Sequence, residues 1–274
     1  MFKKISLLLI IPSIACARPV TFPGLYIGLP YGKPLPHGKY FSTLPIYYYV
    51  ENSPTATGSK VFANDTTLTY YPNKNLLQGT PFSSLTVEQT YYQLDTNRAW
   101  IGNIYNPSLS GGIAWNVSKN LGFSNTLIVY APMNNQGLSV NVWTFADHAA
   151  LTYYDDNSEA TVNVTYGIPG GGSTKFKAPM PNYFNLDLTY VHLFNKFSIG
   201  PVAFGSWDTT LATPWSKFAV GGIIGYDFGK FAVQVWTSKA TNSNQWGGGV
   251  IATFMRIIVP FDNDKIVIRK ALDI

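Results

Sequence analysis

Apolar and polar residues alternate with a period of two in many segments of this chain. Phe184–Tyr190 has apolar side chains at its even positions, and Ala160–Tyr166 shows the same alternation. Successive side chains of a β-strand point to opposite faces, so both segments are predicted to be strands with one apolar and one polar face. Their polar positions include Asn163, Thr165, Asn185, Asp187 and Thr189. After residue 17 no stretch approaches the 18 consecutive apolar residues of a transmembrane helix.

The connections between the predicted strands alternate in length over the second half of the chain. Short turns are predicted at 118–120, 156–158, 195–196 and 229–230, and longer links at 131–137, 168–182, 207–216 and 238–245. Membrane barrels have tight periplasmic turns and longer extracellular loops, whereas both ends of a soluble β-sandwich face the same solvent. The pattern therefore predicts an all-β fold, a transmembrane antiparallel up-and-down β-barrel, with a soluble secreted sandwich as the alternative fold.

About twelve strands of suitable length fit within residues 40–261. They are predicted to start near Tyr40, Lys60, Ser83, Ile104, Leu121, Leu138, Glu159, Tyr183, Lys196, Ser216, Lys230 and Gly247. The first three are the least regular, because polar stretches such as Asn64–Thr67 interrupt their alternation. An even number of strands lets the first pair with the last, so that no edge is left open, and places both termini on the periplasmic side.

Residues 1–17 have the features of a cleaved signal peptide. Lys3 and Lys4 precede a short apolar run, and Ala15-Cys16-Ala17 matches an A-x-A cleavage site, so the mature chain is expected to begin at Arg18. The apolar run is too short for a membrane anchor. Lipidation of Cys16 is a weaker alternative, because Ser13 stands where a bulky aliphatic residue is usual. Cys16 is the only cysteine, so no disulfide or thiolate site is expected in the mature chain.

Two end segments lie outside the predicted barrel. Residues 18–39 are rich in proline and glycine and cannot form a central strand. They are interpreted as a periplasmic arm or, less favoured, as a partial plug folded into the lumen. The C-terminal tail, residues 262–274, is interpreted as a periplasmic extension or an additional short strand.

The composition agrees with a membrane barrel. Aromatic residues make up 15% of the chain and charged residues only 12%, against about 25% charged in soluble domains. The mean hydropathy of +0.04 is too low for a bundle of membrane helices. A net charge of +5 without any basic run gives no indication of nucleic-acid binding. The expected surroundings of the chain are outer-membrane lipid.

The block Asn141–Tyr153 resembles the Asn-x-Trp-x-Phe…Leu-x-Tyr block of an outer-membrane transporter family assigned to the meta-cleavage pathway of phenol degradation. Asn185–Tyr190, Phe197–Pro201 and Gly221–Tyr226 are similar to later strands of that family. The resemblance covers roughly residues 105–261. It implies an outer-membrane barrel that passes small hydrophobic or aromatic compounds. The chain departs from the family pattern at Ala146 and Asp147 and in its C-terminal tail.

Two sets of residues are candidates for functional roles. The aromatic set is expected to anchor the barrel at the membrane interface, because turning it inward to stack on a ligand would require a bulge: Trp143, Phe145 and Tyr153. The polar set is expected to line the lumen: Asn163, Thr165, Asn185, Asp187, Thr189, Gln234 and Arg256. In an open lumen, Asp187 and Arg256 would set the local field and favour solutes with polar groups.

No catalytic or metal-binding pattern is recognised. Asp147 and His148 are adjacent, so on a strand they point to opposite faces, and neither His37 nor His192 has a partner spacing typical of a catalytic triad. No cofactor is expected. The sequence thus favours a passive channel for small hydrophobic or aromatic compounds. The alternatives are a plugged, non-transporting barrel with a role in adhesion or envelope structure, and a barrel hydrolase.

Overall fold

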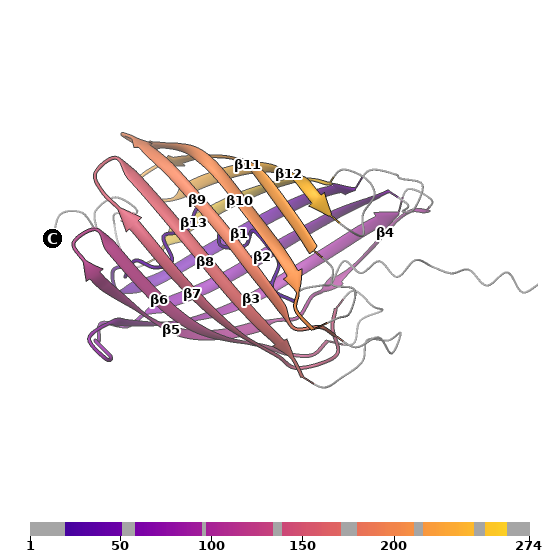
Figure 1. Cartoon of the computed structure of the whole chain (residues 1–274), viewed down its shortest axis with the longest axis horizontal. Helices are drawn as coiled ribbons and strands as arrows, with labels where there is room; N and C mark the ends of the chain where they lie inside the picture. Colours follow the sequence, from indigo (N-terminus) through magenta and orange to yellow (C-terminus); the bar gives the residue numbers. More distant parts are fainter. Residues whose placement is uncertain are drawn as a thin grey trace, which may run out of the picture.

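In the computed structural model one antiparallel sheet closes on itself to form a barrel (Figure 1). The structure describes residues 20–50, 58–94, 97–133, 139–170, 180–210, 216–243 and 250–261. The strands are β1 (Gly38–Val50), β2 (Ser59–Tyr71), β3 (Thr80–Leu94), β4 (Asn97–Ile104), β5 (Ser108–Ser118), β6 (Leu121–Tyr130), β7 (Thr144–Tyr154), β8 (Ser158–Pro169), β9 (Tyr183–Phe194), β10 (Phe197–Asp208), β11 (Ser216–Asp227), β12 (Ala232–Ser243) and β13 (Val250–Pro260). The barrel closes because β1 pairs with both β2 and β13.

The thirteen strands occupy twelve positions around the barrel, which confirms the predicted number. β4 pairs with one half of β3 and β5 with the other half, so the two share a single position. The break between them falls at Tyr105–Pro107, where Asn106 leaves the sheet pattern and binds another segment. Its side chain donates to the carbonyls of Ala131 and Val140 and accepts the N–H of Val140.

Most predicted strand starts lie within three residues of the observed ones, including the first three. Two predictions were wrong. The strand expected near Leu138 begins at Thr144, because Val140 is bonded to Asn106 rather than to a neighbouring strand. Ile104, expected to start a strand, is the last residue of β4, because the strand is interrupted at residues 105–107 before β5 begins.

The connections differ between the two ends of the barrel. Short turns join β5 to β6, β7 to β8, β9 to β10 and β11 to β12 at the end that we call the turn end, on the left in Figure 1. Strands β6, β8, β10 and β12 end at the opposite end, which we call the loop end, and the links that follow them in the sequence are longer. The alternation does not extend to the first half, where the β2–β3 link of 72–79 at the turn end is long and the β3–β4 link of 95–96 is short.

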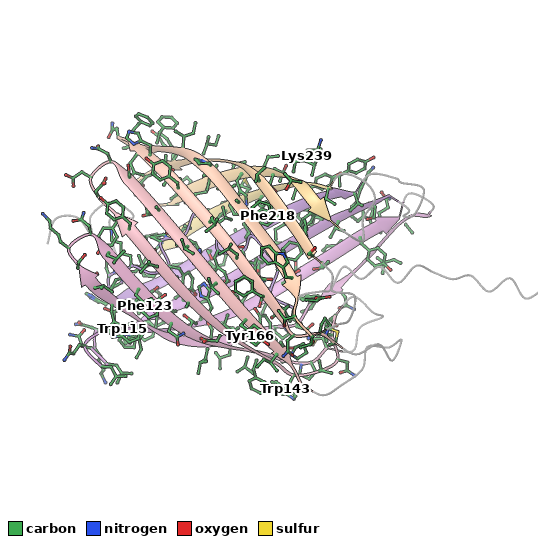
Figure 2. All side chains as sticks on the ribbon, in the orientation of Figure 1. Trp115, Phe123, Trp143, Tyr166, Phe218 and Lys239 are labelled. Carbon is green, nitrogen blue, oxygen red and sulfur yellow. The ribbon has the colours of Figure 1, made fainter. Side chains whose placement is uncertain are left out.

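The outer surface carries aromatic side chains near both ends and aliphatic ones between them. The turn end has Phe194, Phe197, Phe228 and Phe231, and the aliphatic belt includes Val162, Ile199, Val220 and Ile224. Figure 2 shows Trp115 and Phe123 at the turn end, where their rings stack, and Trp143 at the loop end. Paired aromatic girdles around an apolar belt are typical of transmembrane barrels. Within the described residues, no helix is long and apolar enough to cross a bilayer.

The interior is less polar than the alternation predicted. Small or polar side chains face inward from the middle of β7, β8 and β9, as expected. From β10 to β13, however, large apolar side chains also face inward, because they pack on one another and on Ile27 rather than on water. Trp236 stacks on Phe254 with ring centroids 4.8 Å apart, and Phe254 meets Phe204 edge-on.

Candidate functional site: the barrel interior

Residues 20–37, which we call the N-terminal segment, run lengthwise inside the barrel. At the loop end the Thr21 hydroxyl is bonded to the hydroxyls of Tyr130 and Tyr183. Toward the turn end the N–H of Gly32 donates to Oγ1 of Thr152 at 3.0 Å. The segment coils through successive tight turns, with Gly24 and Gly28 at φ of 92° and 75°, values that favour glycine. Figure 1 shows it in indigo between the walls of the barrel.

An acidic and a basic side chain hold the middle of this segment. The carboxylate of Asp187, on β9, accepts the N–H of Gly24 at 2.8 Å and the N–H of Tyr26 at 3.1 Å. The guanidinium of Arg256, on β13, donates to the carbonyls of Leu25 and Ile27. Backbone groups buried away from water need such partners, and bonds to charged groups are the stronger kind. Together the two side chains satisfy alternating donors and acceptors of one short stretch.

Neighbouring polar side chains extend this contact. Oγ1 of Thr189 accepts the N–H of Gly28, while Nε2 of Gln234 donates to the carbonyl of the same residue at 2.6 Å. Nδ2 of Asn185 donates to the carbonyl of Thr21. The segment is therefore hydrogen-bonded to the wall formed by β6, β7, β9, β12 and β13.

All seven residues expected to line the lumen face the interior in the structure. Five of them bind the N-terminal segment: Asn185, Asp187, Thr189, Gln234 and Arg256. Of the other two, Asn163 contacts His148 through Oδ1 and Thr165 is buried beside them. The alternation of the strands placed these side chains on the inner face, but it gave no indication that their partner would be the chain's own N-terminal segment.

His148 and His192 both pack against aromatic rings. His148 is fully buried, stacked on the ring of Tyr26 at 4.0 Å and met edge-on by Tyr31. Asp147 points to the outer face, where its carboxylate accepts a hydrogen bond from Asn125. His192 lies against Phe194. Within the described residues, no group of three or more His, Cys, Asp or Glu side chains is placed to hold a metal ion.

The three aromatic residues of the Asn141–Tyr153 block lie on the outer surface, Phe145 and Tyr153 in β7 and Trp143 just before it. Trp143 and Phe145 are 54% and 55% exposed at the loop end, and Tyr153 is 46% exposed at the turn end. They therefore belong to opposite aromatic bands, and Tyr153 donates its hydroxyl to Asp155 in the adjacent turn. Ala15, Ala17 and the tail of residues 262–274 lie outside the described residues.

A cavity of about 160 Å³ lies on the other side of the N-terminal segment, between it and the wall formed by β1, β2, β3, β5 and β6 together with the turn-end half of β13. It extends from Tyr40, Tyr71 and Pro260 near the turn end to Val20 and Tyr130 near the loop end. Its lining combines rings and aliphatic side chains with hydroxyls: Leu25, Tyr26, Leu29, Tyr31, Leu35, Ser42, Leu44, Thr67, Thr69, Ser84, Thr86, Ser108, Ser110, Ile128 and Ile258. We call this space the lumen cavity.

Three charged side chains line the lumen cavity about halfway along it: Asp65, Glu88 and Arg256. Asp65 and Glu88 are directly opposite each other on β2 and β3, and both face inward. Sequence reasoning identified Arg256 and missed the two acids. Asp65 falls in the polar run 64–67, which was interpreted as a break in the alternation. In the structure that run is part of β2, and its odd-numbered residues Asp65 and Thr67 face inward. Asn64 and Thr66 lie on the opposite face, where the amide of Asn64 is hydrogen-bonded to the hydroxyls of Thr43 and Thr66.

The fold matches those of solved outer-membrane channels. The COG4313 outer-membrane channel from Pseudomonas putida F1 superposes with a TM-score of 0.68 at 11% identity, over 88% of this chain and all of that one. The CymD monoaromatic hydrocarbon channel superposes with a TM-score of 0.54 at 7% identity, over 84% of this chain and 90% of that one. At these identities the similarity establishes the barrel fold. The comparison with curated proteins found no match.

A family model described as "Putative MetA-pathway of phenol degradation" matches residues 32–255. The match begins in the N-terminal segment and includes β1 to β4, so it reaches well before residue 105, where the resemblance seen in the sequence began. It covers most of the chain and ends within β13. The chain therefore belongs to this phenol-degradation family of β-barrels.

Proposed function

We propose that the protein is an outer-membrane channel through which small hydrophobic or aromatic compounds diffuse passively along the lumen cavity. The observation that carries this proposal is a cavity extending from near one end of a closed barrel to near the other, alongside the N-terminal segment. Its volume of about 160 Å³ is close to the ~150 Å³ of an engineered cavity that holds benzene. Residues 1–17 would direct export, and the apolar belt would contact membrane lipid.

The lining of the cavity fits a small aromatic ring with a hydroxyl group. Rings such as those of Tyr26, Tyr31 and Tyr71 offer faces and edges for aromatic contacts. Hydroxyls from the serines and threonines of β2, β3 and β5 can donate to or accept from a phenolic oxygen. The family description names phenol degradation, and CymD is described as a monoaromatic hydrocarbon channel; both support this solute class without defining it.

Solute uptake into liposomes containing the purified protein tests the proposal. We expect phenol and similar solutes to enter faster than they enter empty liposomes. Ser110→Trp places a large ring in the cavity and should slow uptake strongly. Its control, Leu109→Trp, changes the adjacent residue, which points outward, and should leave uptake unchanged. Wild-type protein that inserts into the membrane but passes neither ions nor phenolic solutes would contradict the proposal.

A plugged barrel with an adhesive or structural role is the second candidate. It is favoured by the dense hydrogen bonding of the N-terminal segment, which fills one side of the lumen. On this account the intact protein conducts nothing, and removal of residues 20–37 creates conductance. The proposed channel instead requires conductance with the segment in place. The same bilayer recording therefore separates the two functions.

A further inference from the structure

We propose that Asp65 and Glu88 form a cation-binding site in the lumen cavity, which lets cations and neutral compounds pass and excludes anions such as aromatic carboxylates. This inference rests on the proposed channel and specifies which charge that channel accepts. It concerns two residues that take no part in holding the N-terminal segment.

The two carboxyl groups come from neighbouring strands at the same level of the barrel. Asp65 on β2 and Glu88 on β3 are Cα partners in the register, and both side chains face the cavity. Side chains directly opposite each other on one face of an antiparallel pair have Cβ atoms about 4.5–5.5 Å apart, so the carboxylates can act on one ion together.

Asp65 lacks a hydrogen-bond partner on one oxygen. The side chain is only 7% exposed, and Oδ1 makes no hydrogen bond in the structure. Oε1 of Glu88, by contrast, accepts the hydroxyl of Thr90 at 2.6 Å. A buried carboxylate oxygen without a partner is costly, and a cation entering the cavity would remove that cost.

The positive charge of Arg256 does not balance all of the acidic side chains around it. Its guanidinium donates to the carbonyls of Leu25 and Ile27, and it lies within electrostatic range of both Asp65 and Asp187. The carboxylate of Asp187 accepts hydrogen bonds from backbone N–H groups in the same stretch of the N-terminal segment. The one guanidinium thus faces three acidic side chains, Asp65, Glu88 and Asp187, and its stronger charge partner is Asp65. One basic group cannot balance three acidic ones, so acidic groups are in excess at this level of the interior.

The surroundings suit a cation that has lost part of its hydration. Hydroxyl oxygens of Thr67 and Thr86, the next inward-facing pair on the same two strands, line the cavity beside the acid pair, and oxygen atoms are the preferred ligands of hard cations. Tyr26 and Tyr31 line its other side, and tyrosine ring faces attract organic cations. An aromatic carboxylate at this level would instead face two carboxylates in a space with little water.

Reversal potentials in planar bilayers under a KCl gradient test this inference with the full-length mature protein. We expect wild-type channels to prefer K⁺ over Cl⁻. The double variant Asp65→Asn with Glu88→Gln keeps the size of both side chains, and it should reduce the permeability ratio by on the order of tenfold. In liposomes the same variant should admit benzoate, which the wild type excludes, while phenol uptake is retained.

Asp147→Asn is the matched control, because it removes one carboxylate from the outer surface of β7 and should not change the permeability ratio. Resistance of the folded barrel to denaturation in detergent, compared between variants, shows whether each one has folded. An anion-selective wild type, or a double variant with an unchanged ratio, would overturn the acid-pair site while leaving the channel intact. A wild type without any conductance would instead overturn the proposed function itself.

Discussion

The carboxylate of Asp187 is the side chain whose replacement tests most sharply how the N-terminal segment is held. Its two oxygens accept the N–H groups of Gly24 and Tyr26 at 2.8 and 3.1 Å. In Asp187→Asn only one oxygen remains. The new NH₂ group is a donor, so it cannot accept a hydrogen bond from the backbone N–H that it faces. The change is nearly isosteric, so packing around β9 is preserved and the loss falls on the docked segment.

The size of the effect follows from the bonds removed. Hydrogen bonds to charged groups contribute ~1.5–3 kcal/mol each and neutral ones ~0.5–1.5 kcal/mol. Losing one bond to Asp187 and weakening the other should therefore cost the docked segment about 2–4 kcal/mol. Because every ~1.4 kcal/mol is a factor of ten, the undocked population should rise by roughly 30- to 700-fold.

Hydrogen–deuterium exchange of the reconstituted protein measures this directly. Peptides covering residues 20–32 should exchange faster in Asp187→Asn by a factor of that order, while peptides from β8 and β10 should exchange as in the wild type. The outward-facing variant Asp147→Asn should leave both unchanged. If the barrel strands lose protection together with the segment, or if the segment keeps its protection, the reasoning about Asp187 is wrong.

Three further predictions concern the segment, the interior packing and the membrane surface. Gly32→Ala would put a Cβ 2.6 Å from the N atom of Thr152 and 2.7 Å from the O atom of Gly122, so exchange at residues 30–35 should accelerate while β8 stays protected. Trp236→Ala removes a ring stacked on Phe254 and should lower the free energy of unfolding by about 3–5 kcal/mol, measured by denaturant titration in vesicles. Val162→Arg should cost about 2–4 kcal/mol in the same titration, because Val162 faces outward with the aliphatic Leu151 and Leu188 opposite it, whereas Val162→Leu should be close to neutral.

The sequence predicted the barrel well because the barrel depends on local patterns. Alternation in β8 and β9 depends on which face of a strand each residue occupies, and that is fixed by its position along the strand. The short turns after β5, β7, β9 and β11 follow from local turn chemistry; Gly229 and Asn195, for instance, adopt positive φ there. These features could be recognised without knowing what each strand pairs with.

The sequence left open whether residues 18–39 enter the barrel, and it could not predict which side chains hold the N-terminal segment there. The hydrogen bonds between the N-terminal segment and β9 join residues more than 160 positions apart, and nothing in the spacing of Asp187 indicates Gly24 as its partner. The inward-facing Trp236 and Phe254 likewise break the expected polarity because they pack on each other inside the barrel. The polar lining of the sequence prediction turned out to be largely a binding surface for the chain's own N-terminal segment.

Single-channel recording with a thiol introduced into the lumen cavity tests the central claim most directly. The only cysteine, Cys16, lies in the predicted signal peptide, so a mature protein cleaved after Ala17 would carry no other thiol. In Ser110→Cys, whose side chain would line the cavity, a charged thiol reagent should reduce the conductance permanently, and in the outward-facing Leu109→Cys it should have no effect. A wild-type protein that conducts nothing, or a conductance through Ser110→Cys that the reagent leaves unchanged, would contradict passage along this cavity.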